Sequence, residues 1–336
     1  MNKKLSKYYF LIIILFGIAT FLLNVSLGSV HIPLSEIYNI LMNNNFEQTN
    51  QIILFNYRIP KAITTILVGI SLPLSGMMMQ TLFRNPLAGP YILGITSGAS
   101  LGVAILIMGG SLLPSFLIHE FSQVIFSILG SMLVLLLVLK VSYKVKEVTT
   151  ILLVGIMFGS FSSAIVTLIT SFSNAENLQK FTFWSMGNLG NLSTQSLQIL
   201  SFVVFIGSLL CFLTLKSLNG LILGENYAKS MGVSIQKSRF FIILATSILA
   251  GSVTAFVGPI AFVGLAVPHI AKIIFKTSNH FILFWANIGI GIILMLLCDI
   301  LTFILFKNII LPINAITSIL GAPLLVYLLL KKNKWV

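Results

Sequence analysis

The sequence predicts an all-α, polytopic membrane protein with about ten transmembrane helices. Three observations support this prediction: 57% of the 336 residues are hydrophobic, only 8% are charged, and the apolar runs are long enough to cross a bilayer. A soluble domain carries about 25% charged residues. A chain with so few charges could not cover a water-exposed surface, and its mean hydropathy of +1.05 suits lipid as the solvent.

Each predicted span is a run of about 20 predominantly apolar residues, the length that a helix needs to cross the hydrocarbon core. The candidate spans are 8–27, 59–83, 92–109, 121–140, 149–171, 195–215, 239–257, 259–276, 281–305 and 312–330. At Gly258-Pro259 the sequence leaves two outcomes open, because these residues either kink one long helix or end it. The basic N-terminus is typical of a signal peptide, but no small-residue cleavage site follows the first apolar run, so we expect a retained helix.

The basic residues predict the orientation of the chain. With the N-terminus in the cytoplasm, the outer segments hold only Arg58, Lys61, Lys180 and Lys307, which leaves 16 of the 20 basic residues inside. Cytoplasmic loops carry such an excess of Lys and Arg. The prediction is therefore an even number of helices in the inner (plasma) membrane, with both termini cytoplasmic. The net charge of +13 does not indicate nucleic-acid binding, because the basic residues form short clusters between apolar runs.

Three polar stretches connect the spans: 28–57, 173–193 and 216–239. The first includes a candidate amphipathic turn, and the last is the largest predicted cytoplasmic loop. Within that loop, Leu221 to Gly232 is typical of a short helix that ends at a glycine. Two interpretations stay open: a docking surface for a partner protein, or a capped surface helix.

The sequence contains no recognisable catalytic or metal-binding pattern. His119-Glu120 lacks the second histidine of a zinc protease helix, and Ser97 lacks the glycine spacing of a serine hydrolase. Cys211 and Cys298 lie in apolar runs without metal-ligand spacing. There is no phosphate-binding loop either. We therefore expect a protein that is not an enzyme and binds no metal or cofactor itself; ATP, if it drives the process, is held by another chain.

Asp299 is the acidic residue that falls inside a predicted span. An intramembrane carboxylate indicates function by default, and the alternative is a carboxylate near the interface that pairs with a neighbour or with Lys307. One acid makes a poor proton relay. This argues against the alternative function, an ion-coupled secondary transporter of a small solute.

Glycine and serine recur through three spans, for example at Gly69, Gly76, Gly98 and Gly155. Small residues allow helices to approach closely in lipid. The other interpretation is a translocation path lined by small neutral side chains, which would not trap a bulky solute.

Six segments carry a resemblance to a known family. They are Arg58-Ile59-Pro60-Lys61, residues 75–99 with Arg84-Asn85-Pro86-Leu87-Ala88-Gly89-Pro90, residues 183–189, residues 223–232, residues 258–272 and Gly321-Ala322-Pro323. In this order the chain resembles the FecCD-type permeases, the membrane subunits of siderophore, haem and cobalamin ABC importers.

The resemblance implies a type II ABC importer permease architecture, with residues 1–336 as a single transmembrane permease domain. It implies a dimer with a second copy or a paralogue, and a pathway on the shared axis. Two cytoplasmic ATPase subunits and an extracellular or periplasmic substrate-binding protein would complete the importer. The expected function is transport of an iron chelate into the cytoplasm, a ferric siderophore ahead of haem or cobalamin.

The resemblance also implies roles for individual residues. Coupling to the ATPase, within the loop 216–239, is implied for Glu225, Tyr227, Ala228, Lys229, Met231 and Gly232. Docking of the binding protein is implied for Arg58, Lys61 and Lys307. The cytoplasmic gate is implied for Asn85, Val148 and Thr149. The chain departs from the family at Phe303, where the family usually carries Arg, and Lys307 lies one turn further along.

Overall fold

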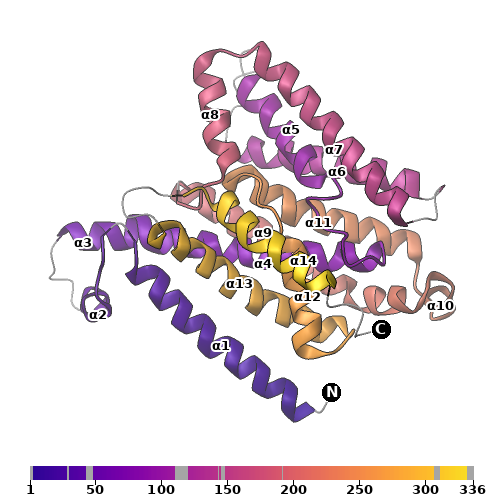
Figure 1. The fold of residues 1–336 in the computed structure, drawn as a ribbon, viewed down its shortest axis with the longest axis horizontal. Coiled ribbons are helices and arrows are strands. Elements are labelled where there is room, and N and C mark those ends of the chain that lie inside the picture. The colour runs from indigo at the N-terminus through magenta and orange to yellow at the C-terminus, as the bar shows by residue number, and fades with distance from the viewer. Residues whose placement is uncertain are drawn as a thin grey trace.

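The computed structural model describes residues 3–28, 30–42, 48–109, 120–142, 144, 148–190, 192–305 and 311–330. Within these ranges the chain is helical and has no strand, which confirms the all-α prediction (Figure 1). The helices are α1 (Lys3–Ser26), α2 (Leu34–Met42), α3 (Gln48–Ile53), α4 (Ile59–Leu82), α5 (Ile95–Met108), α6 (Glu120–Ser142), α7 (Val148–Ser171), α8 (Ala175–Met186), α9 (Thr194–Leu223), α10 (Glu225–Ser230), α11 (Ile235–Val257), α12 (Val263–Phe275), α13 (His280–Ile304) and α14 (Ile313–Leu330). A π-helical turn, η1 (Leu54–Arg58), joins α3 to α4.

Each predicted span coincides with one of these helices. Among the described residues, seven helices are long and apolar enough to cross a membrane by themselves: α1, α4, α6, α7, α9, α11 and α13. The other three spans correspond to the shorter apolar helices α5, α12 and α14. That all ten cross the bilayer stays a prediction.

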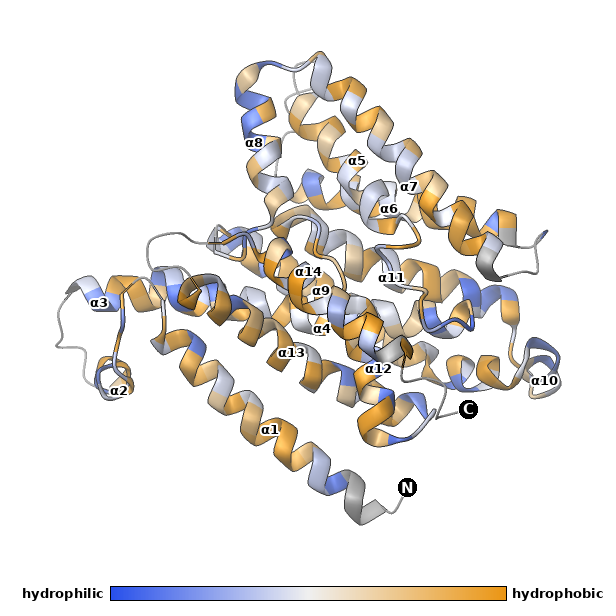
Figure 2. Ribbon diagram, viewed as in Figure 1, coloured by the Kyte–Doolittle hydropathy of each residue, from blue (hydrophilic) through white to orange (hydrophobic). Residues whose placement is uncertain are grey.

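The two ends of the bundle differ in what they carry. The start of α1, the end of α14 and the short helix α10 lie toward one end, which we call the α10 end (Figure 1). Helices α2 and α3 lie at the opposite end, the α2–α3 end. The start of α1 and the end of α14 thus lie toward the same end of the bundle, the arrangement that an even number of crossings requires. Figure 2 shows hydrophobic residues along α1 and α13, and hydrophilic ones on α8 and at the start of α11.

Helices α4 and α11 form the centre of the bundle. Within their apolar windows 78% and 72% of residues are buried, against 22% in both α1 and α7. The peripheral helices therefore expose large apolar side chains, such as Phe16 on α1 and Phe161 on α7. Such exposure is costly in water and expected in lipid.

Glycines hold the central helices close together. The missing side chain of Gly76 on α4 leaves room for the Gly264 carbonyl of α12, and Gly69 faces Gly291 of α13 in the same way. A methyl group at either position would collide with backbone atoms. Close packing is thus the role of these glycines. On α7, by contrast, Ser160 is exposed, so the other interpretation stays open there.

The structure confirms the split at Gly258-Pro259 between the predicted spans 239–257 and 259–276, since α11 stops at Val257 and α12 begins at Val263. Another predicted boundary needed adjustment. The connection predicted as 216–239 is shorter, because α9 continues to Leu223 and α11 already begins at Ile235. The polar residues Lys216 and Ser217 had suggested the start of a loop. The helix continues past them because Leu218 and Leu221 are buried on its packed face.

Candidate functional site

A buried ion pair ties three helices together at the α2–α3 end. Lys61 Nζ on α4 lies 2.6 Å from Asp299 Oδ1 on α13, and the two side chains are only 16% and 3% exposed. The amide of Asn24 on α1 donates to the other carboxylate oxygen at 2.9 Å. Both oxygens of Asp299 are therefore engaged. Of the predicted alternatives, Asp299 pairs with a neighbour; Lys307 lies outside the described residues.

Phe303 completes the environment of the Lys61 ammonium. The nitrogen lies 3.8 Å from the centroid of the Phe303 ring, one turn after Asp299 on α13. A cation over an aromatic face is stabilised by the ring quadrupole. The position where the resemblance would place Arg thus carries a ring that helps to hold a lysine from another helix.

Arg58 is also held inside the chain. The residue is 9% exposed, and its Nη2 donates to the Val30 carbonyl at 2.5 Å. Gly28 packs directly on the guanidinium, where any side chain would collide with it. Two of the three predicted docking cations, Arg58 and Lys61, therefore lie at the α2–α3 end and have partners within their own chain. Their docking role stays a prediction.

A cavity of about 630 Å³ lies beside the ion pair. Lys61 and Asp299 line it together with the aromatic side chains Phe183 and Trp184 of α8 and the first residue of α14, Ile313. Trp184 is anchored by its indole N–H, which donates to the Ala255 carbonyl at 2.7 Å. The loop predicted at 173–193 thus folds as a helix that walls a cavity at this end.

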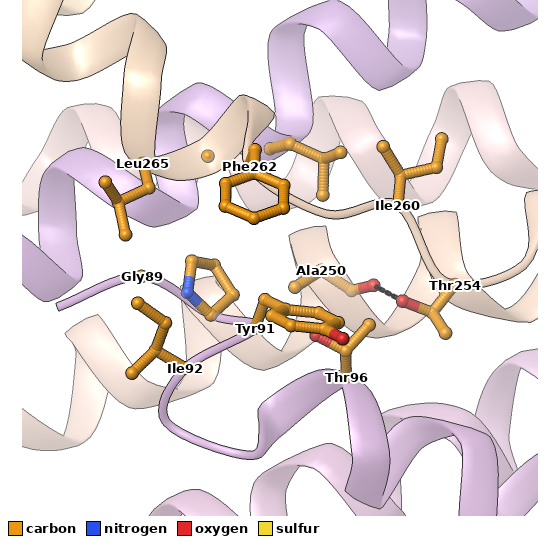
Figure 3. A pocket seen from close by; sticks show the side chains of 12 residues that line it. Gly89, Tyr91, Ile92, Thr96, Ala250, Thr254, Ile260, Phe262 and Leu265 are labelled. Carbon is orange, nitrogen blue, oxygen red and sulfur yellow. Dashed lines mark hydrogen bonds between the residues drawn. The ribbon is translucent and has the colours of Figure 1, made fainter. Parts of the chain in front are cut away.

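The segment between α4 and α5 meets the segment between α11 and α12 at a much smaller pocket of about 30 Å³ (Figure 3). Tyr91, from the segment before α5, stacks on Phe262, with ring centroids 6.5 Å apart. Phe262 has φ +66°, a conformation that is strained for a bulky residue, and it packs against Gly321 of α14. This volume is on the scale of single water molecules and far smaller than a metal chelate. The pocket is therefore a contact between the two connecting segments and is not a candidate substrate site.

The predicted gate residues lie at the ends of α4 and α7. Asn85 follows α4 in a turn: its side-chain oxygen accepts from the backbone N–H of Leu87 at 2.9 Å. The preceding Arg84 has φ +47°, so the chain reverses sharply here. Val148 and Thr149 are the first residues of α7, and their side chains lie outside the described residues.

Helix α10 confirms the short helix predicted between Leu221 and Gly232. Gly224 precedes it with φ +119° and Gly232 follows it with φ +80°, conformations that glycine adopts without strain. Tyr227 and Met231 are 52% and 61% exposed, which is unusual for side chains of this size outside lipid.

The other predicted coupling residues differ in their environment. Lys229 is exposed, and Glu225 is ion-paired with Arg239 of α11 at 2.6 Å. Ala228 is fully buried against Gly220 of α9. Its side chain thus packs within the chain, and a six-residue helix is too short for its sequence pattern to reveal the inward face. The coupling role of Ala228 stays a prediction.

Two polar contacts were not predicted. Asn24 was not expected to bind Asp299, and His280 on α13 was not expected to bond with Thr81 and Asn219. Asn24 stands in an apolar run and His280 directly follows a polar segment, and nothing local identifies the partner of either residue. Within the described ranges, no group of three His, Cys, Asp or Glu residues is placed to hold a metal ion.

The model of the FecCD transport family matches residues 13–331. The probable siderophore transport system permease protein YfhA of Bacillus subtilis is 30% identical and covers 98% of this chain and 96% of its own length. The vitamin B12 import system permease protein BtuC of Vibrio parahaemolyticus is 33% identical, over 92% of each chain.

Solved structures show the same fold. One, described as an inward-facing conformation of an ABC transporter assigned provisionally to the metal-chelate type, superposes with a TM-score of 0.82 at 27% identity, covering 97% of this chain and 99% of the other. PsaBC from Streptococcus pneumoniae, in complex with Fab, shares the fold at a TM-score of 0.58 and 15% identity, covering 83% and 93%.

Proposed function

The chain belongs to the FecCD transport family, and from that membership we propose that it imports an iron chelate into the cytoplasm, a ferric siderophore ahead of haem or cobalamin. It is an ABC transporter permease. The match over residues 13–331 carries the proposal, because it spans both ends of the bundle as well as the core. The relative named for siderophore transport, which aligns with 98% of this chain, supports the choice of substrate.

The proposed importer contains further chains. A second permease, either a copy or a paralogue, would form a shared pathway with this one. Two ATPase subunits would bind at the α10 end, where exposed Tyr227 and Met231 offer apolar contact and Lys229 a charge. A substrate-binding protein would dock at the α2–α3 end, beside the cavity walled by α8. In this orientation both termini of the permease lie on the cytoplasmic side of the inner (plasma) membrane.

The proposed cycle is alternating access. A loaded binding protein docks outside, ATP closes the ATPase pair, and displacement of α10 converts the permease from an outward-open to an inward-open state. Asn85, Val148 and Thr149 would form the gate that opens toward the cytoplasm. Movement of the ligand then depends on the ATPase contact at the α10 end and on the binding-protein contact at the α2–α3 end.

Uptake of a radiolabelled ferric siderophore tests the substrate. A strain that lacks this gene should lose uptake, and the unmodified gene should restore it. A matched competition series with unlabelled haem and cobalamin then separates the three substrate classes. Loss of cobalamin uptake alone, with siderophore uptake intact, would contradict the iron assignment.

The docking role of Lys61 needs a variant that leaves no unpaired charge. Reversing Lys61 to Glu would bring two carboxylates together, so a loss of uptake would not report docking alone. The double variant Lys61→Gln/Asp299→Asn removes both charges at once and keeps polar groups in place. If Lys61 docks the binding protein, this variant inserts normally but its uptake falls. Unchanged uptake removes Lys61 from the docking surface.

The alternative, an ion-coupled secondary transporter, would need a carboxylate that binds and releases a cation during transport. Among the described residues, Asp299 is the buried carboxylate within a span, and Lys61 and Asn24 occupy both of its oxygens. A protonophore added at constant ATP distinguishes the two functions. Uptake that collapses under this treatment would favour ion coupling; uptake that persists favours the ATP-driven importer.

A further inference from the structure

His280 connects three helices at the α10 end. It is the first residue of α13 and is fully buried. Its Nε2 lies 2.8 Å from the Thr81 hydroxyl at the end of α4. On its other side, the Asn219 side-chain oxygen on α9 accepts from the His280 backbone N–H at 2.8 Å and lies 2.9 Å from Nδ1. One imidazole therefore bridges α4, α9 and α13.

The neutral ring satisfies this arrangement. Asn219 presents an oxygen to Nδ1, so Nδ1 carries the proton and Nε2 is the acceptor. The Thr81 hydroxyl has one proton and two acceptors within reach, Nε2 of His280 at 2.8 Å and the Met77 carbonyl of its own helix at 2.9 Å. The Nδ1–H tautomer directs that proton to Nε2. Each polar atom has a partner of the correct kind, and the bridge needs no charge in its apolar surroundings.

The bridge lies between two segments that the transport cycle has to move. Asn219 is one turn before Leu223, where α9 ends and Gly224 leads directly into α10. Thr81 is next to the last residue of α4, and the segment with Arg84 and Asn85 follows it. A displacement of α10 therefore reaches one side of the imidazole, and the predicted gate segment begins on the other side.

We propose that the bridge formed by Asn219, His280 and Thr81 transmits movement of α10 to the segment after α4 that carries the predicted gate residue Asn85. His280 is then a positioning residue of the transport cycle. The inference rests on the proposed function, since it needs an ATPase that moves α10. Apolar contacts alone let helix ends slide past each other, whereas breaking this bridge would leave buried polar groups without partners. The three helix ends therefore move together.

A neighbouring contact does not replace the bridge. Gln80 on α4 donates to the Leu265 carbonyl of α12 at 3.1 Å and lies 3.5 Å from Lys272 Nζ. These contacts join α4 to α12 and do not reach α9, from which α10 extends. Helices α4 and α9 also pack directly against each other through apolar side chains. The polar connection from α9 to the end of α4 runs through His280.

The test compares two identical substitutions on α4. Thr81→Val removes the hydroxyl that binds His280. Thr65→Val is the matched control, since Thr65 is also fully buried but donates only to the Lys61 carbonyl of its own helix. The reconstituted importer, with its ATPase and binding-protein subunits, is assayed in proteoliposomes for ferric siderophore transported per ATP hydrolysed. Thr81→Val should lower this ratio about fivefold or more, whereas Thr65→Val should leave it unchanged.

Two further variants separate transmission from stability. Thr81→Ser keeps the hydroxyl and should restore the transport ratio. Asn219→Ser weakens the other side of the bridge and should lower the ratio without adding to the effect of Thr81→Val, because both break one connection. A ratio in Thr81→Val equal to that of the unmodified importer, an equal loss in Thr65→Val, or fully additive effects would each overturn the inference.

The outcome for the unmodified importer keeps the two proposals apart. If it moves no siderophore with ATP, the proposed function fails. If it transports normally and Thr81→Val does the same, only the bridge fails. If Thr81→Val does not insert, Asn219→Ser carries the test, because Asn219 is only partly buried and tolerates a smaller side chain.

Discussion

The α2–α3 end and the α10 end of the molecule use polar residues in opposite ways. At the α2–α3 end, Lys61 and Asp299 form a buried ion pair whose charges are consumed inside the chain. At the α10 end, the neutral groups of His280, Thr81 and Asn219 join three helices internally, and the ion pair between Glu225 and Arg239 is partly exposed. The comparison teaches that a charged residue at the end of a span can be bound within its own chain, so that its charge alone does not identify a docking residue.

The largest expected effect follows from breaking the ion pair. Lys61→Met removes the ion-pair partner of buried Asp299 and leaves Arg58 as the nearby positive charge. Removing one partner of a buried pair costs about 3–5 kcal/mol. Thermal unfolding in detergent should show the loss. Lys180→Met is the control, because that lysine pairs with Glu176 at an exposed site and its removal should not shift the unfolding midpoint. An unaltered midpoint in Lys61→Met would mean that the carboxylate finds another partner or protonates.

The second prediction concerns the exposed face of α10. Tyr227→Ala combined with Met231→Ala should weaken association with the ATPase subunits about tenfold or more, because aromatic anchors dominate protein interfaces. Titration of the purified permease with the ATPase measures this. Phe202→Ala on α9, whose ring is 64% exposed on the membrane-spanning surface, is the matched control. Equal affinity in the α10 variant would place the ATPase elsewhere.

A smaller effect is expected from the ring that covers Lys61. Phe303→Leu keeps an apolar side chain but removes the aromatic face, so unfolding should become easier by about 1 kcal/mol. The measurement is the midpoint of thermal unfolding, repeated in the Lys61→Gln/Asp299→Asn background. There the substitution should have less effect, since no cation remains. An identical shift in both backgrounds would assign the loss to packing alone.

The smallest effect is expected at the ion pair beside α10. Glu225 is 44% exposed, so Glu225→Gln should cost only about 0.5 kcal/mol, and high salt should reduce the difference from the unmodified chain. Unfolding midpoints at low and high salt give the comparison. A cost as large as that of Lys61→Met would show that the two ends do not differ as described.

The sequence predicted the helices well and the partners of single side chains poorly. The spans, the short helix α10 and the interruption at Gly258-Pro259 follow from local apolar runs and from glycine and proline. Asn24 and Asp299 are separated by 275 positions, and Thr81 and His280 by 199, so their contacts depend on how distant helices pack. The resemblance implied a coupling role for Ala228, and six residues carry too little periodicity to show that its side chain faces inward.

By itself, the sequence determined that this chain spans a membrane, where its helices run and which family it resembles. Hydrocarbon forces every backbone group to bond within its own helix, so apolar length is sufficient to define a span. Only the tertiary structure decided that Lys61 turns toward Asp299, that Ala228 faces inward and that His280 bridges α9 and α4. Those choices depend on which helices become neighbours, and helix neighbours are set by close packing between surfaces far apart in the chain.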